Sequence, residues 1–153
     1  MKSLRMLVLL SAAVVTAGGA QTARAGVDHD SCLSVNASVI GQNLGGGRTE
    51  GTVFHAGILN GTTSSQLEIT GGTPPVLTFV GTGVLTTDHG TLTVSVVGTF
   101  NGATGVFLAT GQVVHGTGVF AGATGVLTFV GVEDLTSGRF TQTITGTVCL
   151  AHG

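Results

Sequence analysis

The chain has 153 residues, including 27 glycines and seven phenylalanines, and it contains no tryptophan or tyrosine. If a signal peptide ends at Ala25, the remaining 128 residues are enough for one domain with one core. In that part, Arg48 and Arg139 are the only cations and stand against seven acidic residues, which leaves a net charge of −5 with neutral histidines. This balance argues against a nucleic-acid partner, because phosphate recognition needs clustered lysine and arginine.

The first 25 residues have the three parts of a secretory signal: two early cations, an apolar run over 6–17, and small residues before position 26. The apolar run of about 12 residues is too short to span a bilayer, and no later segment is long and apolar enough to do so. We therefore expect a signal peptide at 1–25, one domain at 26–153, no membrane span, and a secreted or periplasmic product.

After the signal, apolar and polar residues alternate with a period of two, and no helical period appears. This alternation predicts consecutive strands joined by short, glycine-rich turns. The expected strands contain, in chain order, residues 33–39, 54–58, 67–69, 76–86, 91–96, 105–114, 126–133 and 140–150.

Two local features of this chain order predict specific connections. Asn60-Gly61 is expected to form a type I′ hairpin turn between a strand holding Phe54, Ala56 and Ile58 and the next strand. The segment 100–106 returns 20 residues later as 120–126, which predicts two similar connections.

The two cysteines, Cys32 and Cys149, lie near the two ends of the exported chain. Export to an oxidising compartment predicts a disulfide between them. Because the Cα atoms of a disulfide pair lie within about 7 Å of each other, the first and last strands must be neighbours. The sequence therefore predicts an all-β fold, an eight-stranded antiparallel up-and-down barrel closed by a terminal disulfide.

The glycine-rich run after the sixth strand resembles the signature connection of the allene oxide cyclase and dirigent β-barrel superfamily. The run is Gly116, Thr117, Gly118, Val119, Phe120, Ala121, Gly122, Ala123, Thr124 and Gly125. The similarity extends over about the last 65 residues, and Asp88, His89, Gly90 and Leu92 open a strand as in that family. The resemblance implies an eight-stranded antiparallel barrel, often a homo-oligomer such as a trimer, which holds an apolar small molecule and steers its cyclisation or coupling.

The same run also has a physical interpretation of its own. Its glycines at 116, 118, 122 and 125 allow backbone angles that other residues avoid, so Phe120 can fold back and plug one end of the barrel. Activity in the plant enzymes depends on polar and aromatic cavity residues that include tyrosines, and this chain has no tyrosine. We therefore assign no catalytic residue.

Histidines and carboxylates near the termini form the candidate metal site. The disulfide would bring Asp28, His29 and Asp30 near His152, and such ligands suit zinc or copper. The alternative is two solvated termini, and we favour it because the ligands lack a rigid spacing. No metal or other cofactor is expected.

Two further histidines, His55 and His115, are expected to face solvent. The alternative is that one of them points inward with Glu68 or Gln142 as a cavity acid or base. Arg139 is expected to pair with Glu133 or Asp134 across a turn.

The sequence leaves three functions open. The leading hypothesis is a non-catalytic secreted barrel that binds a small apolar ligand, uncharged or inserted by its apolar tail, or serves a structural role. The second is a stereo-directing cyclase or isomerase that confines an apolar substrate; an interior packed solid by Phe54, Phe79, Phe107 and Phe129 would exclude it. The third is a surface or adhesion protein that uses the threonines at 141, 143, 145 and 147.

Overall fold

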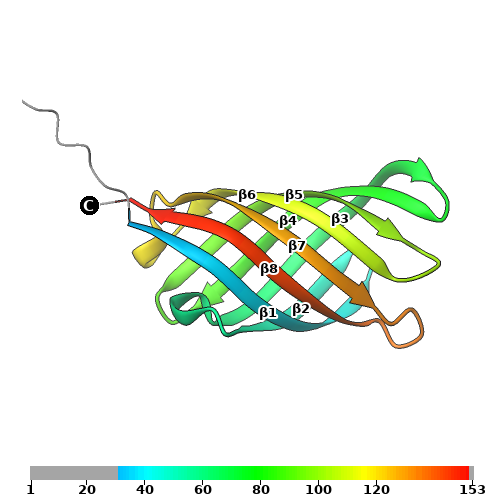
Figure 1. Cartoon of the computed structure of the whole chain (residues 1–153), viewed down its shortest axis with the longest axis horizontal. Helices are drawn as coiled ribbons and strands as arrows, with labels where there is room; N and C mark the ends of the chain where they lie inside the picture. Colours follow the sequence, from blue (N-terminus) through cyan, green and yellow to red (C-terminus); the bar gives the residue numbers. More distant parts are fainter. Residues whose placement is uncertain (1–30, 152–153) are drawn as a thin grey trace, which may run out of the picture.

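The computed structural model describes residues 31–151, which contain eight β-strands and two short 3₁₀ helices (Figure 1). The predicted signal peptide at 1–25 lies outside the described residues. No helix in the part of the chain that the structure describes has the length and hydropathy needed to cross a membrane. The elements are β1 (Ser31–Gly45), β2 (Arg48–Phe54), η1 (Gly57–Leu59), β3 (Gly61–Thr73), β4 (Val76–Thr87), β5 (Gly90–Asn101), β6 (Val106–Gly116), η2 (Gly118–Phe120), β7 (Thr124–Glu133) and β8 (Arg139–Leu150).

The eight strands form one closed barrel in which each strand is antiparallel to the next. The final strand β8 pairs with β1 along its whole length, from Ser31 opposite Leu150 to Gln42 opposite Arg139. Closure joins the first strand to the last, so this barrel has no edge strand. The predicted up-and-down barrel is confirmed.

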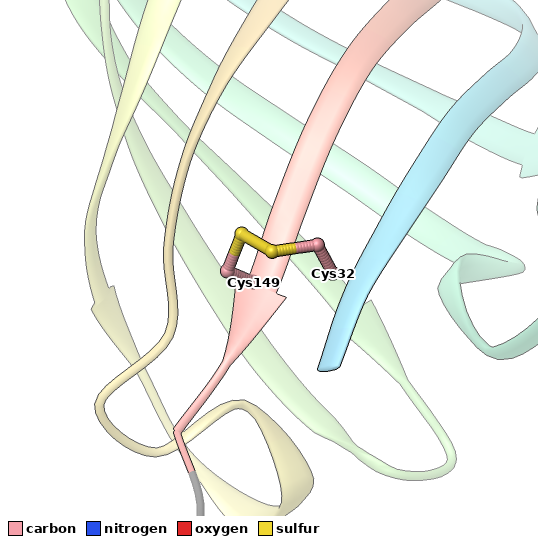
Figure 2. Close-up of a disulfide and its surroundings, with 2 residues drawn as sticks. All are labelled: Cys32 and Cys149. Atoms are coloured by element: carbon pink, nitrogen blue, oxygen red, sulfur yellow. A yellow bond between two sulfur atoms is a disulfide. The ribbon is translucent and has the colours of Figure 1, made fainter. Parts of the chain in front are cut away.

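The predicted disulfide is also present, and it lies on the β1–β8 seam (Figure 2). Cys32 and Cys149 are directly opposite each other in the register of the two strands. Val148, the neighbour of Cys149, is fully buried in the core. Because successive side chains of a strand alternate between faces, the disulfide lies on the outer surface of the barrel.

The two ends of the barrel are built differently (Figure 1). One end holds η1, η2, the turn between β4 and β5, and both ends of the described chain; we call it the capped end. The other end holds the four tight turns β1–β2, β3–β4, β5–β6 and β7–β8; we call it the open end.

The most deeply buried side chains gather toward the capped end. Phe120 and Val148 have no exposed surface, Leu92 is 1% exposed and Leu59 is 4% exposed. Toward the open end, inward-facing side chains are more exposed to solvent, and Ile69 is 53% exposed. The core therefore fills only part of the barrel.

The connection between β2 and β3 is not the predicted type I′ turn. Asn60 has φ −62° and ψ 136°, which is extended backbone, and Gly61 already belongs to β3. The positive φ values of this connection fall at His55 (62°) and Gly57 (60°) instead. The prediction was wrong because Asn60 closes a longer loop, accepting a hydrogen bond from the Ala56 N–H (2.8 Å), and this loop carries Leu59 into the core.

The predicted inward position of Phe54 is wrong as well. In β2 the buried residue is Val53, so the alternation places Phe54 on the outer face, where it is half-buried. Its ring meets the His55 ring edge-on, with centroids 5.0 Å apart. Ala56 and Ile58 lie in the loop and pack against the core from there.

The outer wall of the barrel is rich in threonine and valine. The four threonines of β8 are all exposed, as expected for one face of that strand. Large apolar side chains share this wall, among them Val97, Leu108, Val126 and Val130, each at least half exposed.

Candidate ligand-binding cavity

A cavity of about 560 Å³ occupies the barrel between the buried core and the open end. Sites for small molecules have volumes of about 300–1,000 Å³, so this one is large enough for a ligand. The interior is therefore not packed solid, and the condition that would have excluded a confined substrate is not met. The deep wall is largely apolar and includes Val53, Leu85, Leu92, Val94, Val96, Ala109, Leu127 and Ile144, and five phenylalanines line the cavity: Phe79, Phe100, Phe107, Phe129 and Phe140.

Three of the five phenylalanine rings lie against the wall because glycines stand opposite them on neighbouring strands. Phe79 is opposite Gly98, Phe107 is opposite Gly131, and Phe140 is opposite Gly41. A Cβ on any of these glycines would collide with the facing ring, at 2.7 Å from Cζ of Phe79 in the case of Gly98. Glycine in a strand permits such a close approach. Each of these rings thus packs over the backbone of the neighbouring strand and leaves the centre of the barrel free.

Two phenylalanines also contact each other across the wall. The rings of Phe107 and Phe140 meet edge-on, with centroids 6.1 Å apart and planes at 82°. This is a favourable arrangement for aromatic pairs. The contact links β6 to β8 on the open-end side of the core.

Polar side chains form an arc along one side of the mouth at the open end. The Nδ2 of Asn43 donates a hydrogen bond to Oε1 of Glu133 (3.0 Å), and Asn43 is paired in register with Thr49. Thr49 in turn shares a 2.6 Å hydrogen bond between hydroxyls with Ser65. The Gln142 side chain lines the cavity below this arc. We call Glu133, Asn43, Thr49 and Ser65 the polar arc.

The charged side chains that line the cavity are both acidic. Glu68 and Glu133 are the charged residues among those that line it, and Glu68 is exposed. Arg48 and Arg139 are the first residues of β2 and β8, are exposed, and do not line the cavity. The cavity wall therefore offers no positive charge to a ligand.

The glycine-rich run at 116–125 lies at the capped end, where Phe120 ends the short helix η2. Phe120 is fully buried in the main core, and its N–H donates to the Thr117 carbonyl oxygen (3.1 Å). Gly118 has φ +60°, and a Cβ added to it would collide with the carbonyl oxygen of His89 in the neighbouring turn. A side chain would therefore be strained there. The run thus places an aromatic ring at the base of the barrel. Its other glycines are Gly116, which lies against the Phe120 backbone, Gly122 and Gly125.

The two histidines considered as cavity acids or bases are both exposed and do not line the cavity. His55 follows β2 in the loop to β3, and His115 lies beside a register shift between β5 and β6. Gln142 and Glu68 line the cavity without a histidine beside them in the lining. The interior position was the alternative for these histidines, and the structure does not place them there.

The candidate metal ligands Asp28, His29, Asp30 and His152 lie outside the described residues. Within residues 31–151, no group of three or more histidine, cysteine, aspartate or glutamate side chains is placed to hold a metal ion.

Asp134, one of the two carboxylates beside Arg139, is part of the β7–β8 turn. The Asp134 carboxylate accepts hydrogen bonds from the backbone N–H groups of Thr136 (2.8 Å) and Ser137 (3.2 Å). These two backbone donors hold the pKa of Asp134 below its usual value. Asp134 therefore shapes the β7–β8 turn, while Glu133 bonds to Asn43.

Sequence reasoning missed the polar arc. Asn43 falls in a segment expected to be loop, whereas β1 and its pairing extend through that residue. The signal for Glu133 was present, because it has the same parity as the inward Leu127 and Phe129 of β7. Its partner Asn43 lies 90 residues away in the chain, so their contact follows only from barrel closure.

Comparisons of the chain with protein-family models, with curated proteins and with solved structures gave no significant match.

Proposed function

We propose that this protein binds a small, predominantly apolar molecule inside the barrel, entering from the open end. The observation that carries the proposal is the cavity of about 560 Å³, lined by five phenylalanines and continuous with a polar mouth. Binding sites typically combine an apolar wall with a few polar groups that orient the ligand. The interior has both.

The geometry of the wall supports tight binding without rearrangement. Phenylalanines seated on glycines are fixed by the opposing backbone, so little side-chain freedom is left to lose when a ligand enters. Burial of apolar ligand surface contributes about 25 cal/mol per Å² removed from water. The closed hydrogen-bonded barrel keeps this wall in place.

We propose that the protein carries or binds its ligand outside the cytoplasm, either as a monomer or as an oligomer. A disulfide between Cys32 and Cys149 supports an oxidising compartment, secreted or periplasmic. Exposed valines and leucines on the outer wall are compatible with the homo-oligomer that the family resemblance implies.

The sharpest test of this proposal is a substitution in the cavity wall whose new side chain fills the cavity. Gly83 lines the cavity, and a Cβ built on it would have its nearest neighbours at 4.0 Å, the Ser64 carbonyl oxygen and the Ser65 Cβ. Gly83→Phe should therefore place a ring in the cavity without disturbing the backbone. We expect this variant to keep the fold and to lose binding of a neutral apolar fluorophore, N-phenyl-1-naphthylamine, measured by fluorescence enhancement.

Thr86→Phe is the matched control, because Thr86 lies on the same strand β4 but is exposed on the outer face. It should bind the fluorophore like the natural sequence. Thermal unfolding of both variants shows whether they fold. Equal fluorophore binding by the natural chain and a folded Gly83→Phe variant would place the binding elsewhere and refute the proposal.

A second candidate function is the stereo-directing cyclase or isomerase. The resemblance of residues 116–125 to the allene oxide cyclase and dirigent superfamily supports it, as does the room in the cavity. In this function the wall would hold a folded apolar substrate, and Glu133 or Gln142 would supply the polar group at its reactive end. Incubation with an unsaturated epoxide should then give one enantiomer of a cyclised product, whereas the Gly83→Phe variant should give the racemate formed in buffer alone.

A further inference from the structure

We infer that the ligand carries a cationic or hydrogen-bond-donating head group, a primary amine above all, which binds Glu133 at the mouth while the apolar part lies in the barrel. This inference rests on the proposed function and narrows it to a class of ligand. It is carried by the placement of Glu133, the half-buried one of the two carboxylates that line the cavity, in a largely apolar wall that holds no cation.

Glu133 is held in place as a binding group would be. It ends β7 with its side chain on the inward face, is half-buried, and accepts a hydrogen bond from Asn43 at Oε1. Asn43 is itself fixed, because its backbone N–H donates to the Gly138 carbonyl (2.8 Å) and its Oδ1 accepts from the Gly45 N–H (2.9 Å). The carboxylate is therefore oriented before any ligand arrives.

The chemistry of the carboxylate selects the partner. An ionised carboxylate only accepts hydrogen bonds, and its two oxygens offer about four acceptor sites. The Asn43 amide takes up one of them. An ammonium group has three donors and a charge opposite to that of Glu133, so its hydrogen bonds there are charge-assisted and stronger than neutral ones.

The rest of the polar arc suits the same head group. Thr49 is next to Asn43 in the register, and its hydroxyl is bonded to that of Ser65. Hydroxyl oxygens can accept further hydrogen bonds. On the other side of the mouth, Phe100 and Phe107 are neighbours in register and provide an apolar contact for the first part of the chain.

A carboxylate head is disfavoured at the same place. The cavity wall offers it no cation, and Glu68 adds a second negative charge at the mouth. Removing a carboxylate from water beside like charges costs free energy that nothing here offsets. The expected order of affinity is amine, then alcohol, then acid.

The experiment compares dodecylamine, dodecanol and dodecanoate at pH 7 by calorimetric titration, each below the concentration at which it aggregates. The three probes share one apolar chain and differ only in the head group. We expect the amine to bind about tenfold more tightly than the alcohol, the effect of one charge-assisted hydrogen bond. Raising the salt concentration should reduce this difference, because a half-exposed ion pair is screened.

Two variants separate a binding role of Glu133 from a general effect of charge. Glu133→Gln should bring the amine to the affinity of the alcohol and leave the alcohol unchanged. Glu50→Gln removes the same charge from an exposed position on the outer face of β2, and it should preserve the preference for the amine.

Each result has a defined meaning. Equal binding of all three probes, a preference for the acid, or an amine preference that survives Glu133→Gln would overturn the inference while leaving the binding function standing. Absence of binding for all three by the natural chain would instead count against the proposed function itself.

Discussion

Two segments with nearly the same sequence lie at opposite ends of the barrel and have different structural roles. Residues 100–106 and 120–126 differ at only one position, Asn101 against Ala121. Phe100 lies in β5 and lines the cavity at the open end, where it is half-buried. Phe120 ends η2 at the capped end and has no exposed surface.

The side chain at the position that differs takes part in one connection and not in the other. The Oδ1 of Asn101 accepts hydrogen bonds from the N–H groups of Ala103 (2.9 Å) and Thr104 (3.3 Å), which ties the β5–β6 connection into a tight turn right after the strand. Ala121 has no such acceptor, and the chain before it forms a 3₁₀ turn closed by its N–H to the Gly118 carbonyl (3.1 Å). The β5–β6 turn leaves its end of the barrel open, whereas the 3₁₀ turn before Ala121 places the ring of Phe120 inside the barrel.

The largest expected effect is the loss of the ring at the capped end. Phe120→Ala should lower the free energy of unfolding by about 3–5 kcal/mol, because it removes a fully buried ring and leaves a void. Phe100→Ala should cost about 1 kcal/mol, because that ring is only half-buried beside an existing cavity. Denaturant unfolding measures both, and equal losses would contradict the division into a capped and an open end.

Reducing the disulfide tests the capped end by a second route. The bond joins residues separated by 117 positions, and its loss should lower stability by about 2–5 kcal/mol through greater freedom of the unfolded chain. The Cys32→Ser, Cys149→Ser double variant should match the reduced protein. Thiol titration of denatured protein from an oxidising compartment should find no free sulfur, and two reactive thiols there would show that the bond does not form.

The residue that distinguishes the two segments gives a smaller effect. Asn101→Ala should destabilise the protein by about 0.5–1.5 kcal/mol, because it removes the acceptor of two backbone hydrogen bonds. Ala121→Asn is the control, since that residue is exposed, and it should change stability by less than about 0.5 kcal/mol. A larger loss from the control would mean that the identity of residue 101 does not separate the two turns.

The smallest effect concerns the β7–β8 turn of the open end. Backbone donors from Thr136 and Ser137 lower the pKa of Asp134 in the folded protein. Its contribution to stability is therefore present above the unfolded pKa of about 3.9 and is lost as pH falls through the lower folded value. Carbon-detected NMR titration should find the Asp134 midpoint below about 3.9, and a midpoint at or above that value would show that the turn does not hold the carboxylate.

The barrel fold could be predicted from the sequence because the sequence features that indicate it are local or covalent. Alternation along segments such as 140–150 assigns inward and outward faces, and the positions of Cys32 and Cys149 require the first and last strands to meet. Neither signal depends on the details of packing.

The errors and omissions come from interactions between distant residues. Asn60-Gly61 has the composition of a tight turn, but burial of Leu59 outweighs that preference and lengthens the loop. The cavity depends on glycines such as Gly131 standing opposite rings such as Phe107, a register that alternation alone does not specify. The contact of Asn43 with Glu133 likewise requires the three-strand arrangement of β7, β8 and β1.

The barrel is hollow toward one end, and we propose that an apolar ligand binds there. Intermolecular nuclear Overhauser effects between dodecanol and methyl-labelled protein show whether it does. We expect contacts from the terminal methyl of the ligand to Leu92 and Ile144 in the cavity, and from the hydroxyl end to the methyl of Thr49 at the mouth. Contacts confined to outer-wall residues such as Val126, or the reverse orientation in the barrel, would contradict it.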